Sequence, residues 1–161
     1  MKSILIPTDF SIKSLQLVRA AVERFPGTQL DITLVHALEP DHSISGLLMM
    51  TKRLGVHQLY TPEFTEACEV LRNKYASAVS RIRVEFYYGV TKRYLKDFLE
   101  ARNVEAILFA GDYALKLPSK DSRNFYPELA ASGYPVFHEN LQRAGQKTFS
   151  ESSSLSALLP A

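Results

Sequence analysis

Two short segments that follow apolar runs could together form a binding site. Pro7-Thr8-Asp9 follows one short apolar run, and Gly111 follows another. A hydroxyl and a carboxylate can hydrogen-bond a ligand, but Thr8 and Asp9 are equally suited to a local turn or helix cap. Gly111 also fits a tight turn at the end of a strand. Both interpretations are open for all three residues.

Three basic residues follow Gly111, namely Lys116, Lys120 and Arg123. Their charge could meet phosphate groups, although exposed loops commonly carry such residues for solvation alone. The loop is therefore a candidate anion site, with an ordinary solvated loop as the alternative.

Other familiar chemistries are not indicated. The sequence contains no Walker A loop, G-x-G-x-x-G, H-E-x-x-H or G-x-S-x-G motif. The four histidines lack ligand spacing, and His36 is expected to be a hydrogen-bonded residue of the core or its rim. Cys68, the only cysteine, lies among apolar residues of a predicted helix and is expected to be a core thiol. We predict no catalytic residue, and no metal site.

The apolar runs and capping residues predict alternating strands and helices. Strands are expected at about 4–6, 30–37, 81–88, 106–110 and 134–139. Helices are expected after the caps Ser11, Thr61 and Thr91, and around Pro127. The helix after Thr61 should run to about residue 80. The helix after Thr91 should bury Tyr94, Leu95, Phe98 and Leu99.

This alternation predicts a doubly wound α/β fold, with a mostly parallel five-stranded sheet and helices on both faces. The first and fourth strands are apolar throughout, so they should be central. The third strand alternates and should have a wetter face that includes Tyr87, as expected at a sheet edge. The order 3-2-1-4-5 follows. Ligands of such sheets bind where the winding reverses, here between Pro7-Thr8-Asp9 and Gly111-Asp112.

The first forty residues carry a resemblance to a known family. ILIPTDFS at 4–11, a helix, and ITLVH at 32–36 resemble the opening of a universal stress protein. The strand ending at Gly111 and the Pro135-Val136 pair extend the resemblance in outline to residue 139. It implies the same 3-2-1-4-5 sheet and a homodimer through the fifth strand, with Tyr134, Val136 and Phe137 in the interface. An unpaired edge strand independently favours such pairing.

The phosphate-binding motif of that family is largely missing. ATP-binding members carry G-x2-G-x9-G-[ST], whose backbone amides cradle the phosphates. Counted from Gly111, this chain has Ala114, Asn124 and Phe125 at the other positions. Counted back from Pro135, it has Ser122 and Arg123 at the last pair. Neither alignment restores the motif, and the bulky residues argue against the usual triphosphate pose.

The resemblance nonetheless implies candidate nucleotide-binding residues. Asp9 would contact an adenine, and Ala37 would line the same pocket. Pro7 and Thr8 would flank Asp9, while Gly111 and Ser122 would belong to the phosphate loop.

Composition sets the remaining expectations. The chain has 161 residues and a formal charge of only +2, which indicates neither a nucleic-acid nor a membrane partner. The N-terminal apolar run is too short for a signal peptide, so a cytoplasmic location is expected. Residues 1–139 are predicted to form one domain with an irregular insertion at 41–59, followed by a polar, Ser-rich tail at 140–161.

Three functions are compatible with these features. The first is a dimeric, non-enzymatic stress-response module with absent or altered nucleotide binding, which needs no cofactor. The second is an adenine-nucleotide binder or slow ATPase that holds ATP with Asp9 and the loop after Gly111. The third is an adaptor that binds a protein partner through the 41–59 insertion. The broken glycine motif favours the first and third, and the intact Pro7-Thr8-Asp9 keeps the second open.

Overall fold

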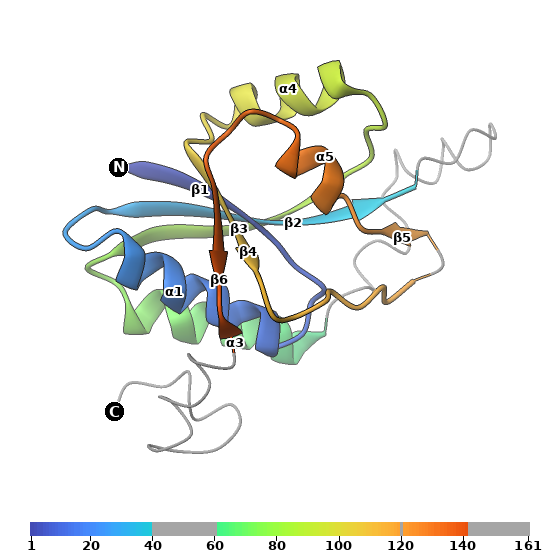
Figure 1. Cartoon of the computed structure of the whole chain (residues 1–161). Coiled ribbons are helices and arrows are strands. Elements are labelled where there is room, and N and C mark those ends of the chain that lie inside the picture. The colour runs from blue at the N-terminus through green and yellow to red at the C-terminus, as the bar shows by residue number, and fades with distance from the viewer. Residues whose placement is uncertain (40–60, 120, 142–161) are drawn as a thin grey trace.

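A mostly parallel sheet forms the middle layer of the molecule (Figure 1). The computed structural model describes residues 1–39, 61–119 and 121–141. Within these ranges the strands are β1 (Lys2–Pro7), β2 (Leu30–Leu38), β3 (Val79–Tyr87), β4 (Ala106–Ala110), β5 (Ser122–Arg123) and β6 (Val136–Glu139). Their order is β3-β2-β1-β4-β6, and β5 pairs with β2. The predicted order 3-2-1-4-5 is confirmed, with β6 in the place of the fifth strand.

The apolar strands lie in the centre, as predicted. β1 pairs in parallel with both β2 and β4, and the side chains of Ile4, Leu5 and Ile6 are buried. β5 was not predicted. It has only two residues and is antiparallel to the end of β2, so no apolar repeat announces it.

Four α-helices flank this sheet in the described ranges. They are α1 (Gln16–Arg24), which follows the 3-10 turn η1 (Lys13–Leu15), α3 (Pro62–Lys74), α4 (Lys92–Ala101) and α5 (Tyr126–Ala130). The hydroxyls of Thr61 and Thr91 accept hydrogen bonds from the amides of Phe64 and Tyr94. These two predicted N-caps are therefore confirmed, and each satisfies an otherwise unpaired helix amide. The third, Ser11, precedes η1 rather than α1, and its hydroxyl accepts from the Ser14 amide.

The helices cover both faces of the sheet, as Figure 1 shows. Under α1 and α3, residues such as Ile32 and Leu34 of β2 pack against Leu17 and Phe64. Under α4 and α5, Leu5 and Ile107 belong to a second buried cluster. The predicted doubly wound class is confirmed, and the sheet has a hydrophobic core on each side.

Two local predictions were wrong. α3 ends at Lys74 rather than near residue 80, because β2 recruits the following residues into the sheet and the Leu30 amide donates to the Ala78 carbonyl. Tyr87 and Tyr94 exchange their predicted environments. Tyr87 is buried against Phe125, whereas Tyr94 on α4 is exposed.

The predicted insertion at 41–59 and Lys120 lie outside the described residues. So does the predicted tail beyond residue 141. At its start, Leu141 is buried, and its amide donates to a carboxylate oxygen of Asp112. At least the first part of the segment after β6 thus packs against the domain.

Candidate functional site

The turn after β1 is held by its own side chains. The Thr8 hydroxyl accepts a hydrogen bond from the Phe10 amide, and the Ser11 hydroxyl accepts one from the Ser14 amide. Phe10 has a φ of 63°, which is unusual for a bulky residue. Its buried ring packs edge-on against Phe64 at a centroid distance of 5.4 Å. Packing and local hydrogen bonds therefore fix this turn at the carboxyl end of the sheet.

The Asp9 carboxylate is fully engaged within the protein. One oxygen accepts from the amide and the hydroxyl of Ser11 at 3.0 and 2.5 Å. The other accepts from the Tyr113 hydroxyl at 2.5 Å and the Lys116 amide at 2.9 Å. Burial alone would raise the pKa of Asp9, but these hydrogen bonds together hold it below its ordinary value. Asp9 thus ties the segment after β4 to the end of β1.

His36 on β2 forms a second link to that segment. Its Nδ1 lies 2.8 Å from the Thr8 carbonyl, and its Nε2 lies 2.7 Å from the Ser122 hydroxyl. A carbonyl can only accept, so Nδ1 carries the proton and Nε2 of the neutral ring accepts from Ser122. Burial lowers the pKa of His36, partly opposed by the Thr8 carbonyl and the Asp9 charge. The expectation of a hydrogen-bonded core histidine is confirmed.

This Ser–His contact was not foreseen, because 86 residues separate its partners. A serine hydroxyl bonded to a histidine ring also occurs in nucleophilic catalysis. Here the surroundings of the pair indicate a structural role. Ser122 is buried and also accepts from the Ser119 amide at 3.2 Å. Neither Ser122 nor His36 is among the described residues that line the cavity beside them.

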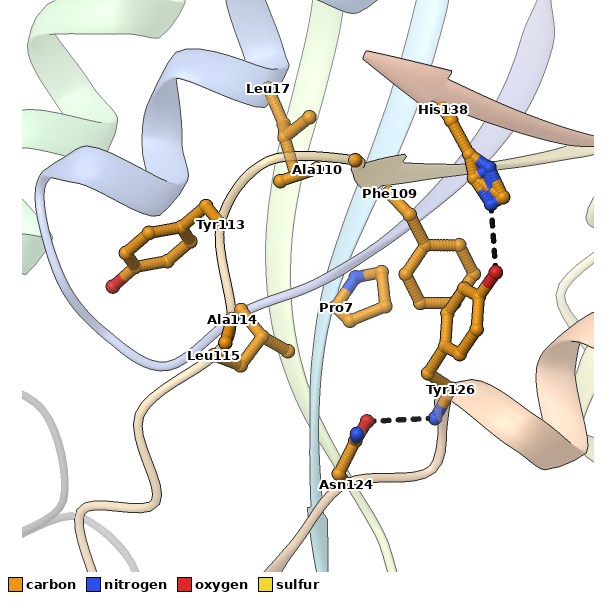
Figure 2. Close-up of a pocket in the computed structure, with 11 residues that line it drawn as sticks. Pro7, Leu17, Phe109, Ala110, Tyr113, Ala114, Leu115, Asn124, Tyr126 and His138 are labelled. Carbon is orange, nitrogen blue, oxygen red and sulfur yellow. Dashed lines mark hydrogen bonds between the residues drawn. The ribbon is translucent and has the colours of Figure 1, made fainter. Parts of the chain in front are cut away.

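That cavity has a volume of about 580 Å³ and opens where the winding of the sheet reverses. Figure 2 shows its walls. Its described lining comes from β1, β4 and β6, from the helices α1 and α5, and from the segment between β4 and α5. The lining residues are Pro7, Leu17, Phe109, Ala110, Gly111, Tyr113, Ala114, Leu115, Asn124, Tyr126 and His138. A space of this size is typical of small-molecule sites.

Comparison with known proteins bears on the fold. No protein-family model and no curated protein sequence matches the chain. Among solved structures, the hypothetical protein MJ0577 aligns with a TM-score of 0.53 at 16% identity, over 86% of this chain and 95% of that one. The universal stress protein UspA from Lactobacillus plantarum aligns with a TM-score of 0.50 at 15% identity, over 86% and 96%. This chain has the fold of the universal stress proteins.

The universal stress protein fold was predicted from the resemblance of the first forty residues, and the structure confirms it. Identities this low establish the fold alone. What the crevice can bind must therefore be argued from the residues that this chain places there.

The structure divides the candidate nucleotide-binding residues into two groups. Pro7 and Gly111 line the cavity. The other four are buried beside it: Thr8 and Asp9 in the turn after β1, Ala37 paired with Arg123 across β2 and β5, and Ser122 against His36. Asp9 and Ala37, which the resemblance assigns to the adenine, are thus buried and engaged in contacts within the protein.

The two described basic residues after Gly111, Lys116 and Arg123, are not among the residues that line the cavity. The Arg123 guanidinium bonds the Glu128 carboxylate and the Gly89 carbonyl, and lies over the Tyr87 ring. Lys116 supplies its amide to Asp9, but it is not among the described lining residues. None of those lining residues is Lys, Arg, Asp or Glu.

Sequence reasoning missed the aromatic wall of the cavity. Phe109, Tyr126 and His138 come from β4, α5 and β6, respectively. Parallel pairing of β4 with β6 places Phe109 beside His138, and the Tyr126 ring of α5 contacts both. In the sequence, Phe109 is one of five apolar residues of a predicted strand. No spacing in the sequence relates it to Tyr126 or His138.

Other candidate sites can be placed briefly. Burial, with a smaller effect of the Glu69 charge, raises the pKa of the half-buried Cys68 thiol to about 12, as suits a core thiol. Among the residues described, no three His, Cys, Asp or Glu side chains are grouped to hold a metal ion. The described helices include none with the length and apolar character needed to cross a membrane.

Proposed function

We propose that this chain is a non-enzymatic stress-response module of the universal stress protein fold that has lost the usual triphosphate pose. The engagement of Asp9 carries the proposal. Its carboxylate accepts four hydrogen bonds, two of them from the segment that follows β4. An adenine could reach this carboxylate only by displacing Tyr113 and Lys116, which would break two hydrogen bonds to a buried charged acceptor.

The chemistry of the cavity supports the same conclusion. A triphosphate would bring several negative charges against a described lining that contains no cation. Placing charge in a partly enclosed site without a partner is costly. Gly111, the one retained glycine of the motif, also has no steric need to be glycine. A Cβ there would meet Glu139 and His138 only at ordinary contact distances of 3.6 Å.

Thermal unfolding with and without magnesium-ATP tests the proposal. A ligand stabilises a protein only as far as it binds the folded state preferentially. We therefore expect no change in melting temperature at any ATP concentration, and no nucleotide in the supernatant when the purified protein is denatured and analysed by mass spectrometry.

A dose-dependent rise in melting temperature would contradict the proposal. If Asp9→Ala abolished that rise while Asp97→Ala, a change on α4, preserved it, the alternative of an adenine-nucleotide binder would be supported instead. The same rise in both variants would place the nucleotide elsewhere.

We also propose that the module is a homodimer paired through β6. β6 pairs with β4 on one side, and no described strand lies on its other side. Ile107 donates to the Pro135 carbonyl, and Gly111 donates to the Glu139 carbonyl. Because alternate residues direct their backbone groups to opposite sides, Val136 and His138 present theirs to the open edge.

A further inference from the structure

We infer that the cavity between β4, β6 and α5 binds an uncharged, planar aromatic compound. The inference rests on the proposed loss of the triphosphate pose and names what the same crevice takes in its place. It depends on three features of the described lining: an aromatic wall, a few polar groups at its edge, and the lack of Lys, Arg, Asp and Glu side chains.

The aromatic wall consists of Phe109, Tyr126 and His138. The rings of Phe109 and Tyr126 meet edge to face, with centroids 4.4 Å apart and planes at 82°. The Tyr126 and His138 centroids are 5.7 Å apart. Figure 2 shows these rings together on one side, with Pro7 between them and Leu115. A flat ring inserted here would meet aromatic surface in the offset or edge-on arrangements that such rings prefer.

The polar groups at the cavity are partly engaged in hydrogen bonds with one another. The Tyr126 hydroxyl lies 2.9 Å from Nε2 of His138, and the Asn124 side-chain oxygen accepts from the Tyr126 amide at 3.0 Å. The Asn124 amide nitrogen remains as a donor beside the aromatic wall. A few fixed polar groups on a mostly apolar lining select the orientation of a ring that carries a nitrogen or oxygen.

The charges described around the cavity do not favour a strongly anionic ligand. Lys13 has its Nζ 5.1 Å from the Tyr113 ring centroid, but it is not among the described lining residues, and neither is Lys116. Arg123 is held by Glu128 and the Gly89 carbonyl. A ligand phosphate or sulfonate would thus lose water without an ion-pair partner among the described lining residues, whereas a neutral ring would lose little.

Two fluorescent probes that differ by one charge test the inference. N-phenyl-1-naphthylamine is neutral, and 1-anilinonaphthalene-8-sulfonate has the same ring system with a sulfonate added. We expect saturable one-to-one binding of the neutral probe to the full-length protein, and binding of the sulfonate that is weaker by at least about tenfold.

Variants tie the binding to the cavity. Tyr126→Leu removes part of the aromatic wall, and Ala114→Phe fills the space from an exposed position that should tolerate the change. Each should weaken binding of the neutral probe by about tenfold or more. Tyr94→Leu is the matched control, because this exposed tyrosine on α4 does not line the cavity, and it should leave binding unchanged.

Equal affinity for the two probes would overturn the inference, as would neutral-probe binding that Ala114→Phe leaves intact. Failure of the neutral probe to bind would also overturn it, while the proposed loss of ATP binding would stand on its own melting data. The converse result is that ATP binds without displacing the neutral probe. That result would contradict the proposed loss of ATP binding, but it would leave the inferred uncharged aromatic ligand of the cavity standing.

Discussion

The Nε2 atom of His36 lies 2.7 Å from the Ser122 hydroxyl. Through this contact β2 holds the segment between β4 and α5 against the carboxyl end of the sheet. Nδ1 donates to the Thr8 carbonyl, so Nε2 of the neutral ring accepts the Ser122 hydroxyl proton. Protonation of the ring would make Nε2 a donor and reverse this hydrogen bond, although the Ser122 oxygen already accepts from the Ser119 amide.

Stability should therefore fall in mild acid. The folded-state pKa of His36 lies below its ordinary value of 6.5. Above that value the ring is neutral in both states and stability is fully present. As the pH falls below it, the unfolded chain binds a proton that the folded chain resists, so stability is lost until the pH passes the folded-state pKa.

Melting temperatures between about pH 5 and pH 8 measure this effect. The wild-type protein should lose more stability across the range than His36→Gln. His138→Gln, which changes an exposed histidine, should follow the wild-type curve. Parallel curves for the wild type and His36→Gln would show that the buried ring does not control the response.

Asp9 and Tyr113 should be energetically coupled. Asp9→Ala leaves four donors without their acceptor and should lower the free energy of unfolding by about 2 to 4 kcal/mol. Tyr113→Phe removes one hydrogen bond to a charged acceptor and should cost about 1 to 2 kcal/mol.

Denaturant titration of both variants and the double variant gives the coupling energy, which we expect to exceed about 0.5 kcal/mol. Tyr94→Phe, which alters an exposed hydroxyl, is the control and should have little effect. Simple additivity of the two changes would mean that the contact contributes nothing.

Two glycines that follow strands should differ in how much stability the protein loses when each is replaced by alanine. A Cβ on Gly89 would collide with the Tyr94 ring and would lie 2.5 Å from the hydroxyl oxygen of the buried Tyr87. Gly89→Ala should therefore cost about 1 to 3 kcal/mol. Gly111→Ala, with room for the methyl group, should stay within about 0.5 kcal/mol of the wild type. Thermal or denaturant unfolding would compare them, and a greater loss at Gly111 would contradict the packing described above.

The contrast between these glycines illustrates what the sequence could predict. Short apolar runs predicted β1 and β4, and the N-caps Thr61 and Thr91 predicted the helices that follow them. These predictions succeeded because each depends only on neighbouring residues. Pro7 and Gly111 were predicted at the ligand crevice, and both line the cavity. The need for glycine at position 89 arises from Tyr87 and Tyr94, whose environments were predicted the wrong way round.

The rest of the site depends on contacts between distant parts of the chain. Tyr113 reaches Asp9 across 104 residues, and no spacing in the sequence encodes that distance. The same holds for Ser122 and His36, whose pairing follows from the two-residue strand β5 on β2. The reversal of winding in the predicted strand order located the cavity that Pro7 and Gly111 line, but it could not locate these contacts between distant residues.

The dimer is tested by light scattering. We expect about 36 kDa, twice the 18.1 kDa chain. Val136→Pro should give monomers, because it removes an amide that faces the open edge of β6 while the bonds from Ile107 and Gly111 to Pro135 and Glu139 remain.

Phe137→Pro is the matched comparison. It would remove an amide that faces β4, and should therefore lower the melting temperature of the domain itself, unlike Val136→Pro. A wild-type monomer at micromolar concentration would refute pairing through β6.

The bond from the Lys116 amide to Asp9 also bears on how the chain folds, since it closes a loop of 107 residues. The entropy of closing so long a loop opposes this contact until β1 and β4 already lie side by side. We expect the segment over the crevice to dock after the folding transition state, so that Tyr113→Phe speeds unfolding and leaves the folding rate nearly unchanged in stopped-flow measurements. A slower folding rate would place this contact in the nucleus. On the expected route, the crevice is assembled on a finished sheet, and its covering segment can open and close again without the sheet coming apart.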